Sequence, residues 1–229
     1  MKILGLLGGT SWVSTIDYYR YINEGINARL GDLNFAECII HSFNYADIKR
    51  NNDANDWAKT GDMMIAAGQH LKDSGAKALV LCANTMHIVA DRVEQTLQIP
   101  VIHIATATAD AIIAKGLNKV ALLGTRFTME RDFFRDKLTA KGIEILIPDD
   151  DDRGFIHYTI FEELGRGILN PESKSRYIGI MNKLAAQGAQ GVILGCTEIP
   201  LLISNDDVSI PLFDTTIIHA NAAVEFALG

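Results

Sequence analysis

The sequence lacks the segments that would tie it to a membrane, a nucleic acid or an oxidising compartment. No apolar run approaches the ~20 residues of a membrane span. The chain opens directly on a strand-like run without a signal peptide, so we expect a cytoplasmic location. Its 21 Lys and Arg residues are outnumbered by 28 Asp and Glu and form no cluster, which disfavours nucleic acid and membrane surfaces as partners. The 3 cysteines, without CxxC spacing, indicate neither a disulfide framework nor a zinc site.

Two phosphate-binding motifs are also missing. The glycine-rich start, GLLGG at residues 5–9, does not have the GxGxxG spacing that lets a backbone approach a dinucleotide pyrophosphate. No GxxxxGK[ST] sequence follows elsewhere. The acidic run at residues 149–152 is expected to be a solvated loop, because carboxylates at successive positions cannot all converge on one ion. We therefore expect no resident cofactor and no metal.

Strand and helix patterns alternate along the chain. In the first half, the expected strands cover residues 2–8, 35–43, 77–82 and 101–105, and the expected helices 14–30, 56–74 and 86–97. In the second half, the expected strands cover residues 119–124, 143–147, 191–196 and 210–213, and the expected helices 128–141, 153–165, one opening at Asn170, and 215–228. Strands separated by helices of this length indicate parallel sheets.

This order predicts an α/β fold of two similar Rossmann-like domains with parallel sheets, related by a pseudo-two-fold axis. The expected domains are residues 1–105 and 106–214, with the helix at 215–229 packing back on the first domain.

One stretch of the first half is repeated in the second. GAKALVLCANT at residues 75–85 aligns without gaps on GAQGVILGCTE at residues 188–198, and the alignment pairs Cys196 with Ala83, not with Cys82. Each copy reads as a helix stop, a buried strand and then small polar residues at the strand's carboxyl end, where open α/β sheets bind ligands. The duplication predicts that the strand ends face a shared cleft holding one small substrate.

Polar side chains at these strand ends are the candidate ligands of that substrate. Hydroxyls, an amide and the free N–H groups of helix starts suit a carboxylate. The candidates are Thr10, Ser11, Asn84, Thr85, Thr125, Thr128, Thr197 and Glu198, with the thiol of Cys196 beside them. The alternative is that Asn84 and Thr197 are only helix caps.

Four motifs together resemble the aspartate/glutamate racemase family, and the resemblance runs over the whole chain. They are GLLGGTSW at residues 5–12, ANTMH at 83–87, LGT at 123–125 and GCTEI at 195–199. The resemblance implies pyridoxal-independent racemisation of aspartate or glutamate, in which one cysteine removes the α-proton and a second returns a proton to the opposite face. The family's first cysteine stands directly before the Asn-Thr pair, where this chain has Ala83. Racemisation is therefore expected to be slow or asymmetric.

The resemblance assigns proton transfer to Cys196 and leaves the second group open. Cys82 serves as the second catalytic thiol only if the strand end twists, because neighbouring side chains on a strand point to opposite faces; otherwise it is a small buried hydrophobe. Thr85, His87 or a water could serve instead. In the family a basic residue follows a Glu-Leu helix, which makes Arg166 the candidate for the distal carboxylate.

The polar cluster at residues 49–52, which includes Asn52, could reach the same pocket or could form a solvated loop. Two other functions stay open: a decarboxylase or isomerase of the same superfamily that uses one cysteine, and a non-catalytic amino-acid binding module. The sequence leaves undecided whether aspartate or glutamate fits and whether the chain forms a homodimer.

Overall fold

The computed structural model describes residues 1–229, which form two compact units. The first comprises Met1–Ile104 and Thr216–Gly229, and the second Ala105–Thr215. Each unit holds a four-stranded sheet in which all strand pairs are parallel, and helices accompany both sheets, so the predicted α/β fold class is confirmed. None of the helices combines the length and apolar character needed to cross a lipid bilayer.

The sheet of the first unit has the strand order β2-β1-β3-β4. Its strands are β1 (Leu4–Gly8), β2 (Cys38–Ser42), β3 (Ala78–Leu81) and β4 (Val101–Ile102). Its helices are α1 (Trp12–Leu30), α2 (Tyr45–Asp53), α3 (Trp57–Asp73), the 3-10 helix η1 (Thr85–Val89), α4 (Ala90–Leu97) and α10 (Thr215–Leu228).

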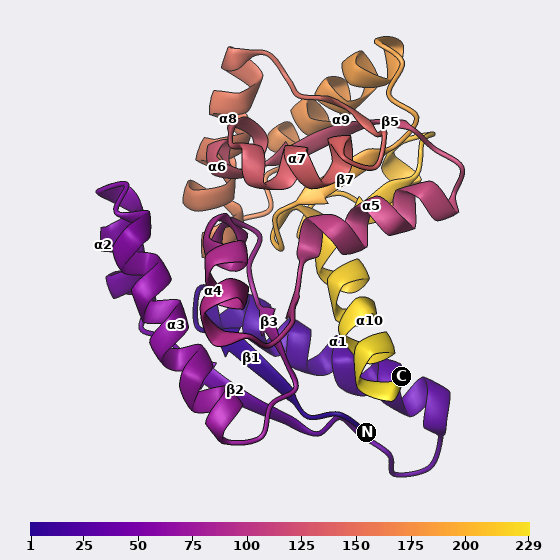
Figure 1. The fold of residues 1–229 in the computed structure, drawn as a ribbon. Helices are drawn as coiled ribbons and strands as arrows, with labels where there is room; N and C mark the ends of the chain where they lie inside the picture. The colour runs from indigo at the N-terminus through magenta and orange to yellow at the C-terminus, as the bar shows by residue number, and fades with distance from the viewer. The chain divides into compact units, whose positions relative to one another are not determined.

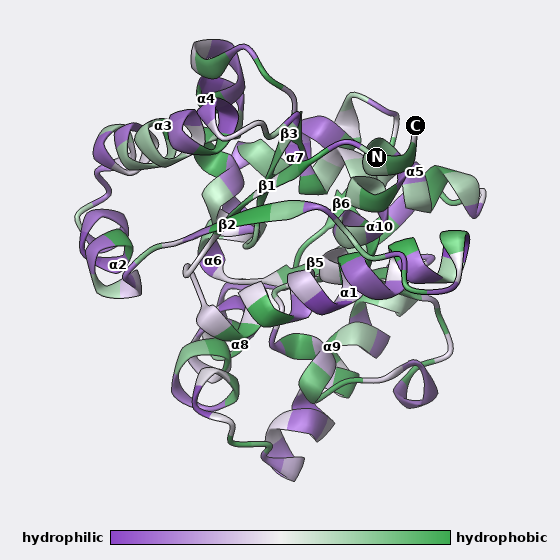
Figure 2. Ribbon diagram, turned by 90° about the horizontal axis from the view of Figure 1, so that it is seen from below, coloured by the Kyte–Doolittle hydropathy of each residue, from purple (hydrophilic) through white to green (hydrophobic).

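The inner strands β1 and β3 of this sheet are buried on both faces, because their side chains alternate between two helix layers. Leu4, Leu6 and Val80 pack with α1 and α10, while Leu7 and Leu81 pack with α3 and α4. Figure 1 shows α3 on one side of the sheet and α1 with α10 on the other. Figure 2 shows the matching hydropathy, with largely hydrophobic β1 and β2 and much more hydrophilic colour on α2. The alternation fixes which side chains near the strand ends reach the core.

Helix α1 begins earlier than predicted. The sequence expectation places its start at Ser14, but the helix spans Trp12–Leu30 and is capped by Ser11, whose Oγ accepts from the N–H of Ser14 at 3.4 Å. Ser14 and Thr15 lie inside the first turn and are buried. The Ser14 hydroxyl donates to the carbonyl oxygen of Cys82 at 2.9 Å. Cys82 follows β3 and is distant in sequence, so the sequence around Ser14 does not indicate this contact.

Of the two alternatives for residues 49–52, the solvated loop is wrong. These residues belong to α2, and both asparagines of the cluster are buried. The Nδ2 of Asn51 donates to the sulfur of Met63, and the Oδ1 of Asn52 accepts from the hydroxyl of Thr60 at 3.2 Å. Packing of α2 on α3 thus stabilises a helix whose polar sequence has little helical preference of its own.

The sheet of the second unit has the strand order β6-β5-β7-β8. Its strands are β5 (Lys119–Gly124), β6 (Glu144–Leu146), β7 (Val192–Gly195) and β8 (Leu212–Asp214). Its helices are α5 (Ile104–Ala114), α6 (Arg126–Glu130), α7 (Asp132–Thr139), α8 (Asp150–Glu162), η2 (Leu164–Arg166), α9 (Pro171–Ala186), η3 (Ile199–Leu201) and η4 (Asn205–Asp207).

Three expectations for the chain from β4 onward need correction. The strand expected at 101–105 ends at Ile102, and α5 follows where β-branched Ile and Thr residues favour a strand locally. The helix expected at 128–141 is split into α6 and α7, because Arg131 is extended with φ −91° and ψ 153°. The helix expected at 153–165 begins at Asp150.

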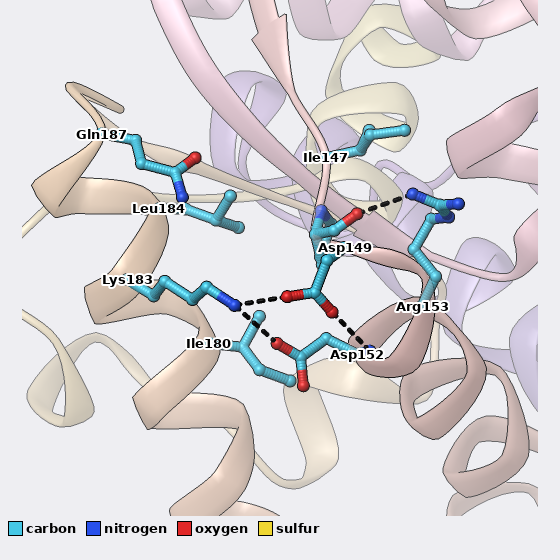
Figure 3. A pocket seen from close by; sticks show the side chains of 9 residues that line it. Ile147, Asp149, Asp152, Arg153, Ile180, Lys183, Leu184 and Gln187 are labelled. Carbon is cyan, nitrogen blue, oxygen red and sulfur yellow. Dashed lines mark hydrogen bonds and ion pairs between the residues drawn. The ribbon is translucent and has the colours of Figure 1, made fainter.

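The acidic run is therefore the start of α8 and not a loop. The Asp149 side chain caps the helix by accepting from the N–H of Asp152 at 3.0 Å, and carboxylates in a first turn face the positive end of the helix dipole. Figure 3 shows Lys183 reaching between Asp149 and Asp152 in a pocket. Its Nζ forms ion pairs with both carboxylates and lies 3.6 Å from Oδ2 of Asp152. Ion pairs thus occupy the carboxylates that face this pocket.

Candidate functional site

The carboxyl end of β1 turns tightly into helix α1. Gly9 has φ +78°, and a Cβ there would lie 2.3 Å from the backbone of Phe43, so only glycine fits this turn. Thr15 Oγ1 accepts from the Gly9 N–H at 2.9 Å. Thr10 follows; it is 7% exposed, and its hydroxyl has no hydrogen-bond partner. The turn therefore places an unpaired, buried hydroxyl next to the amino end of a long helix, in front of the Ser11 cap.

The carboxyl end of β3 carries the first-half copy of the repeat. Cys82 is fully buried among Leu4, Leu6 and Tyr18, and its thiol lies 3.7 Å from the Val80 carbonyl. Burial raises the pKa of this thiol far above its usual range. The strand alternation thus gives Cys82 the environment of a small core residue, and Ala83, partly buried, packs toward the opposite layer.

Asn84 and Thr85 follow this strand. Asn84 is 5% exposed, and its side chain makes no capping bond to the helix that follows. The chain winds as the 3-10 helix η1 before α4 begins at Ala90, so the single helix predicted over 86–97 is wrong in its first turn. The capping alternative is not supported for Asn84, and half-buried Thr85 lies beside it.

The carboxyl end of β5 presents two buried threonines. Thr125 caps α6, because its Oγ1 accepts from the N–H of Thr128 at 3.3 Å. The two hydroxyl oxygens also lie 3.3 Å apart. Capping of α6 therefore accounts for these hydrogen bonds between Thr125 and Thr128.

The carboxyl end of β7 brings together Cys196, Thr197 and Glu198. The Cys196 thiol donates to Glu198 Oε2 at 2.9 Å, and the Thr197 hydroxyl donates to the same oxygen at 2.7 Å. Thr197 is therefore engaged with a carboxylate and does not cap η3, which begins after Glu198. The three consecutive side chains form one hydrogen-bonded cluster, which we call the thiol cluster.

Electrostatics hold the Cys196 sulfur in its protonated form. Burial raises the pKa of the thiol well above its usual value, and the negative charge of Glu198 raises the pKa further. Hydrogen bonds from the backbone N–H groups of Glu198 and Thr197 act in the opposite direction but are weaker. The resting thiol must lose its proton before it can act as a base, and Glu198 is positioned to accept it.

The two remaining sequence candidates, Arg166 and Asn52, belong to helices and not to strand ends. Arg166 lies at the end of η2 with 63% of its side chain exposed and forms an ion pair with Glu162. Asn52 lies within α2 and bonds to Thr60, as described above.

Sequence reasoning missed a buried network in the first unit. The hydroxyl of Tyr18 lies 2.8 Å from Nδ1 of His219, whose Nε2 lies 2.6 Å from the carbonyl oxygen of Ile102. The rings of His87 and His219 are 5.2 Å apart. Of the three histidine and tyrosine side chains in this network, His87 carried a signal in the sequence, because it lies two positions after the Asn84-Thr85 pair.

Comparison with known proteins assigns the family. The family model for Asp/Glu/Hydantoin racemases matches residues 7–223. The chain is similar to a candidate Asp/Glu racemase from Yersinia pestis of known crystal structure, with 48% sequence identity and a TM-score of 0.96. It is also similar to the crystal structure of PH1733, an aspartate racemase homologue from Pyrococcus horikoshii, with 36% sequence identity and a TM-score of 0.88. Both matches cover 100% of each chain. The broad specificity amino-acid racemase RacX of Bacillus subtilis is 24% identical over 236 residues, which cover 97% of this chain and 96% of RacX. This chain belongs to the Asp/Glu/Hydantoin racemase family.

Proposed function

We propose that this protein racemises an acidic amino acid at the α-carbon without pyridoxal, and that Cys196 is the proton-transfer residue. The observation that carries the proposal is the thiol cluster: a cysteine at the carboxyl end of β7 hydrogen-bonded to the carboxylate of Glu198 at 2.9 Å. The family membership and the racemase relatives support the same reaction class.

The thiol cluster supplies the first half of the reaction. An amino-acid α-proton is far less acidic than a thiol, whose ordinary pKa is ~8.5. In the proposed step Glu198 takes the thiol proton, and the thiolate then removes the α-proton, leaving a carbanion. Donors aimed at the substrate carboxylate stabilise the charge that builds there. The unpaired hydroxyl of Thr10 is a group of this kind.

Inversion also needs a proton delivered to the opposite face of the carbanion. At the repeat position that matches Cys196 the chain has Ala83, whose side chain carries no exchangeable proton. Because Cys82 is fully buried, we propose that it does not replace the missing thiol and that Thr85 or a water is the donor on that face. We therefore expect the two enantiomers to exchange their α-protons at unequal rates.

The acidic side chain is the more specific part of the proposal. A distal carboxylate requires a cation, and the proposed partner is Arg166, whose guanidinium can form a bidentate pair. The relatives include both aspartate-named and broad-specificity racemases, so the substrate panel must be wider than the acidic amino acids.

A second candidate reaction uses one thiol only. The single cysteine in the thiol cluster, together with Ala83 in the other copy, favours a decarboxylase or isomerase of the same superfamily over an enzyme with two thiols. Release of carbon dioxide from substituted malonates measures this directly.

The activity is tested by proton NMR of α-deuterium incorporation in heavy water. L- and D-aspartate, L- and D-glutamate, alanine, serine and lysine are incubated separately with protein pretreated with hydroxylamine, which removes any pyridoxal. The proposal expects incorporation into aspartate or glutamate together with formation of the opposite enantiomer. No incorporation into any amino acid, with or without malonate turnover, would reject it.

A further inference from the structure

His87 lies directly behind the turn that follows β3. Its Nδ1 is 3.0 Å from the carbonyl oxygen of Ala83 and 3.3 Å from that of Asn84. The residue is 2% exposed, the Ile102 carbonyl also approaches its ring, and its buried Nε2 makes no hydrogen bond of good geometry. The side chain is thus enclosed in the first unit, and its bonds go to the backbone that carries Asn84 and Thr85.

These contacts determine which ring nitrogen carries the proton. Carbonyl oxygens only accept hydrogen bonds, so Nδ1 must be the donor to Ala83 and Asn84. Burial lowers the pKa of the ring to about 4, which keeps it neutral at physiological pH. A neutral ring protonated on Nδ1 has its lone pair on Nε2, the atom that makes no hydrogen bond of good geometry. His87 therefore has the Nδ1–H tautomer.

The rest of the buried network holds this ring in place. His103 and His219 approach His87 edge to face, with centroid distances of 4.8 and 5.2 Å. The His219 Nε2–H donates to the Ile102 carbonyl, so its Nδ1 accepts from the Tyr18 hydroxyl. The network thereby links α1 and α10 to the turn.

We infer that His87 is a positioning residue, whose Nδ1–H binds the carbonyls of Ala83 and Asn84 and so fixes the turn that presents Asn84 and Thr85 to the substrate. Without this donor the two carbonyls lose a buried partner and the turn becomes mobile. The inference about substrate rests on the proposed function, whereas the inference about the turn does not.

Two amide variants separate the donor from the ring that carries it. In His87→Asn the amide nitrogen occupies a position like that of Nδ1, whereas in His87→Gln it lies near that of Nε2. The exposed residue His70 provides the matched control, His70→Gln. The first measurement is long-range proton–nitrogen NMR of the wild-type rings, for which we expect the Nδ1–H tautomer at His87. An Nε2–H tautomer would overturn the inference.

The second measurement is hydrogen exchange of the His87 backbone amide, which donates to the Asn84 carbonyl at 3.0 Å. We expect exchange at least about tenfold faster in His87→Gln than in His87→Asn, and no change in His70→Gln. Equal exchange in the two His87 variants would contradict the role of the donor.

The third measurement is kinetic. His87→Gln should raise KM for the racemised amino acid by about tenfold with a smaller change in kcat, and His87→Asn should restore KM to near the wild-type value. A general loss of stability would lower activity in both variants alike, which would contradict positioning. If the wild type racemises nothing while the tautomer and exchange results hold, the proposed function fails and the positioning of the turn stands.

Discussion

Acidification should destabilise the first unit, because two buried histidines gain protons when it unfolds. Burial lowers the pKa of His87 from 6.5 to about 4, and burial with the neighbouring His87 ring lowers that of His219 to about 3. In the unfolded chain both rings regain a pKa near 6.5. Below that pH the unfolded state binds more protons than the native state. Stability is therefore full above a pH of about 6.5 and falls as pH decreases toward the native pKa values.

The magnitude follows from these values. Between about pH 7.5 and about pH 5 the native rings stay largely neutral, while the unfolded rings become almost fully protonated. Linkage gives a loss of about 2 kcal/mol for each ring, or about 4 kcal/mol for both. The carboxylates with lowered pKa, such as Asp149 and Asp150, begin to contribute only at lower pH, because their ordinary pKa is 3.8. This separates the histidine effect from ordinary acid unfolding.

Urea unfolding followed by tryptophan fluorescence measures this loss, since both tryptophans, Trp12 and Trp57, lie in the first unit. The wild type should lose about 4 kcal/mol of unfolding free energy across the interval, and His219→Asn only about 2 kcal/mol. His70→Asn, at an exposed position, should behave as the wild type. A wild-type loss below about 1 kcal/mol, or equal losses in wild type and His219→Asn, would refute the reasoning.

Three further substitutions test other parts of the account. Arg166→Leu should weaken binding of dicarboxylic substrates by ~1.5–3 kcal/mol and leave alanine and serine unaffected; equal losses for all amino acids in a kinetic panel would place Arg166 outside the side-chain pocket. Ala83→Cys should raise turnover in the slow direction of racemisation, whereas Cys82→Ser should change turnover little. Circular dichroism of the substrate measures both rates. Loss of activity in Cys82→Ser would make Cys82 the second base. Gly9→Ala should lower the free energy of unfolding by roughly 2 kcal/mol or more, because φ is +78° and the new Cβ meets backbone; a urea titration with no shift in midpoint would contradict this.

The sequence was most informative where local pattern and burial agree. The repeat at residues 75–85 and 188–198 located β3 and β7, and strand alternation anticipated that Cys82 would be a core residue. The thiol cluster follows from three consecutive residues at a strand end, so its members were predictable. Its internal hydrogen bonds were not, because the rotamer of Glu198 depends on its surroundings.

Features that depend on distant contacts escaped prediction. Tyr18 and His219 are 201 positions apart, and no local pattern relates them. Helix α2 is formed by polar residues whose burial depends on α3, and α5 contains β-branched residues that favour a strand when read alone. In each case tertiary packing outweighed local preference.

The assignment of proton transfer to Cys196 is tested most directly by single substitutions at two cysteines. α-Deuterium incorporation into aspartate and glutamate is measured in heavy water for the wild type, Cys196→Ser and the control Cys38→Ser, whose residue lies in β2 and not at a strand end of the site. Serine is a far poorer base than a thiolate, so Cys196→Ser should lose nearly all exchange while circular dichroism shows an intact fold. Cys38→Ser should exchange as the wild type does. Exchange retained in folded Cys196→Ser would contradict the account.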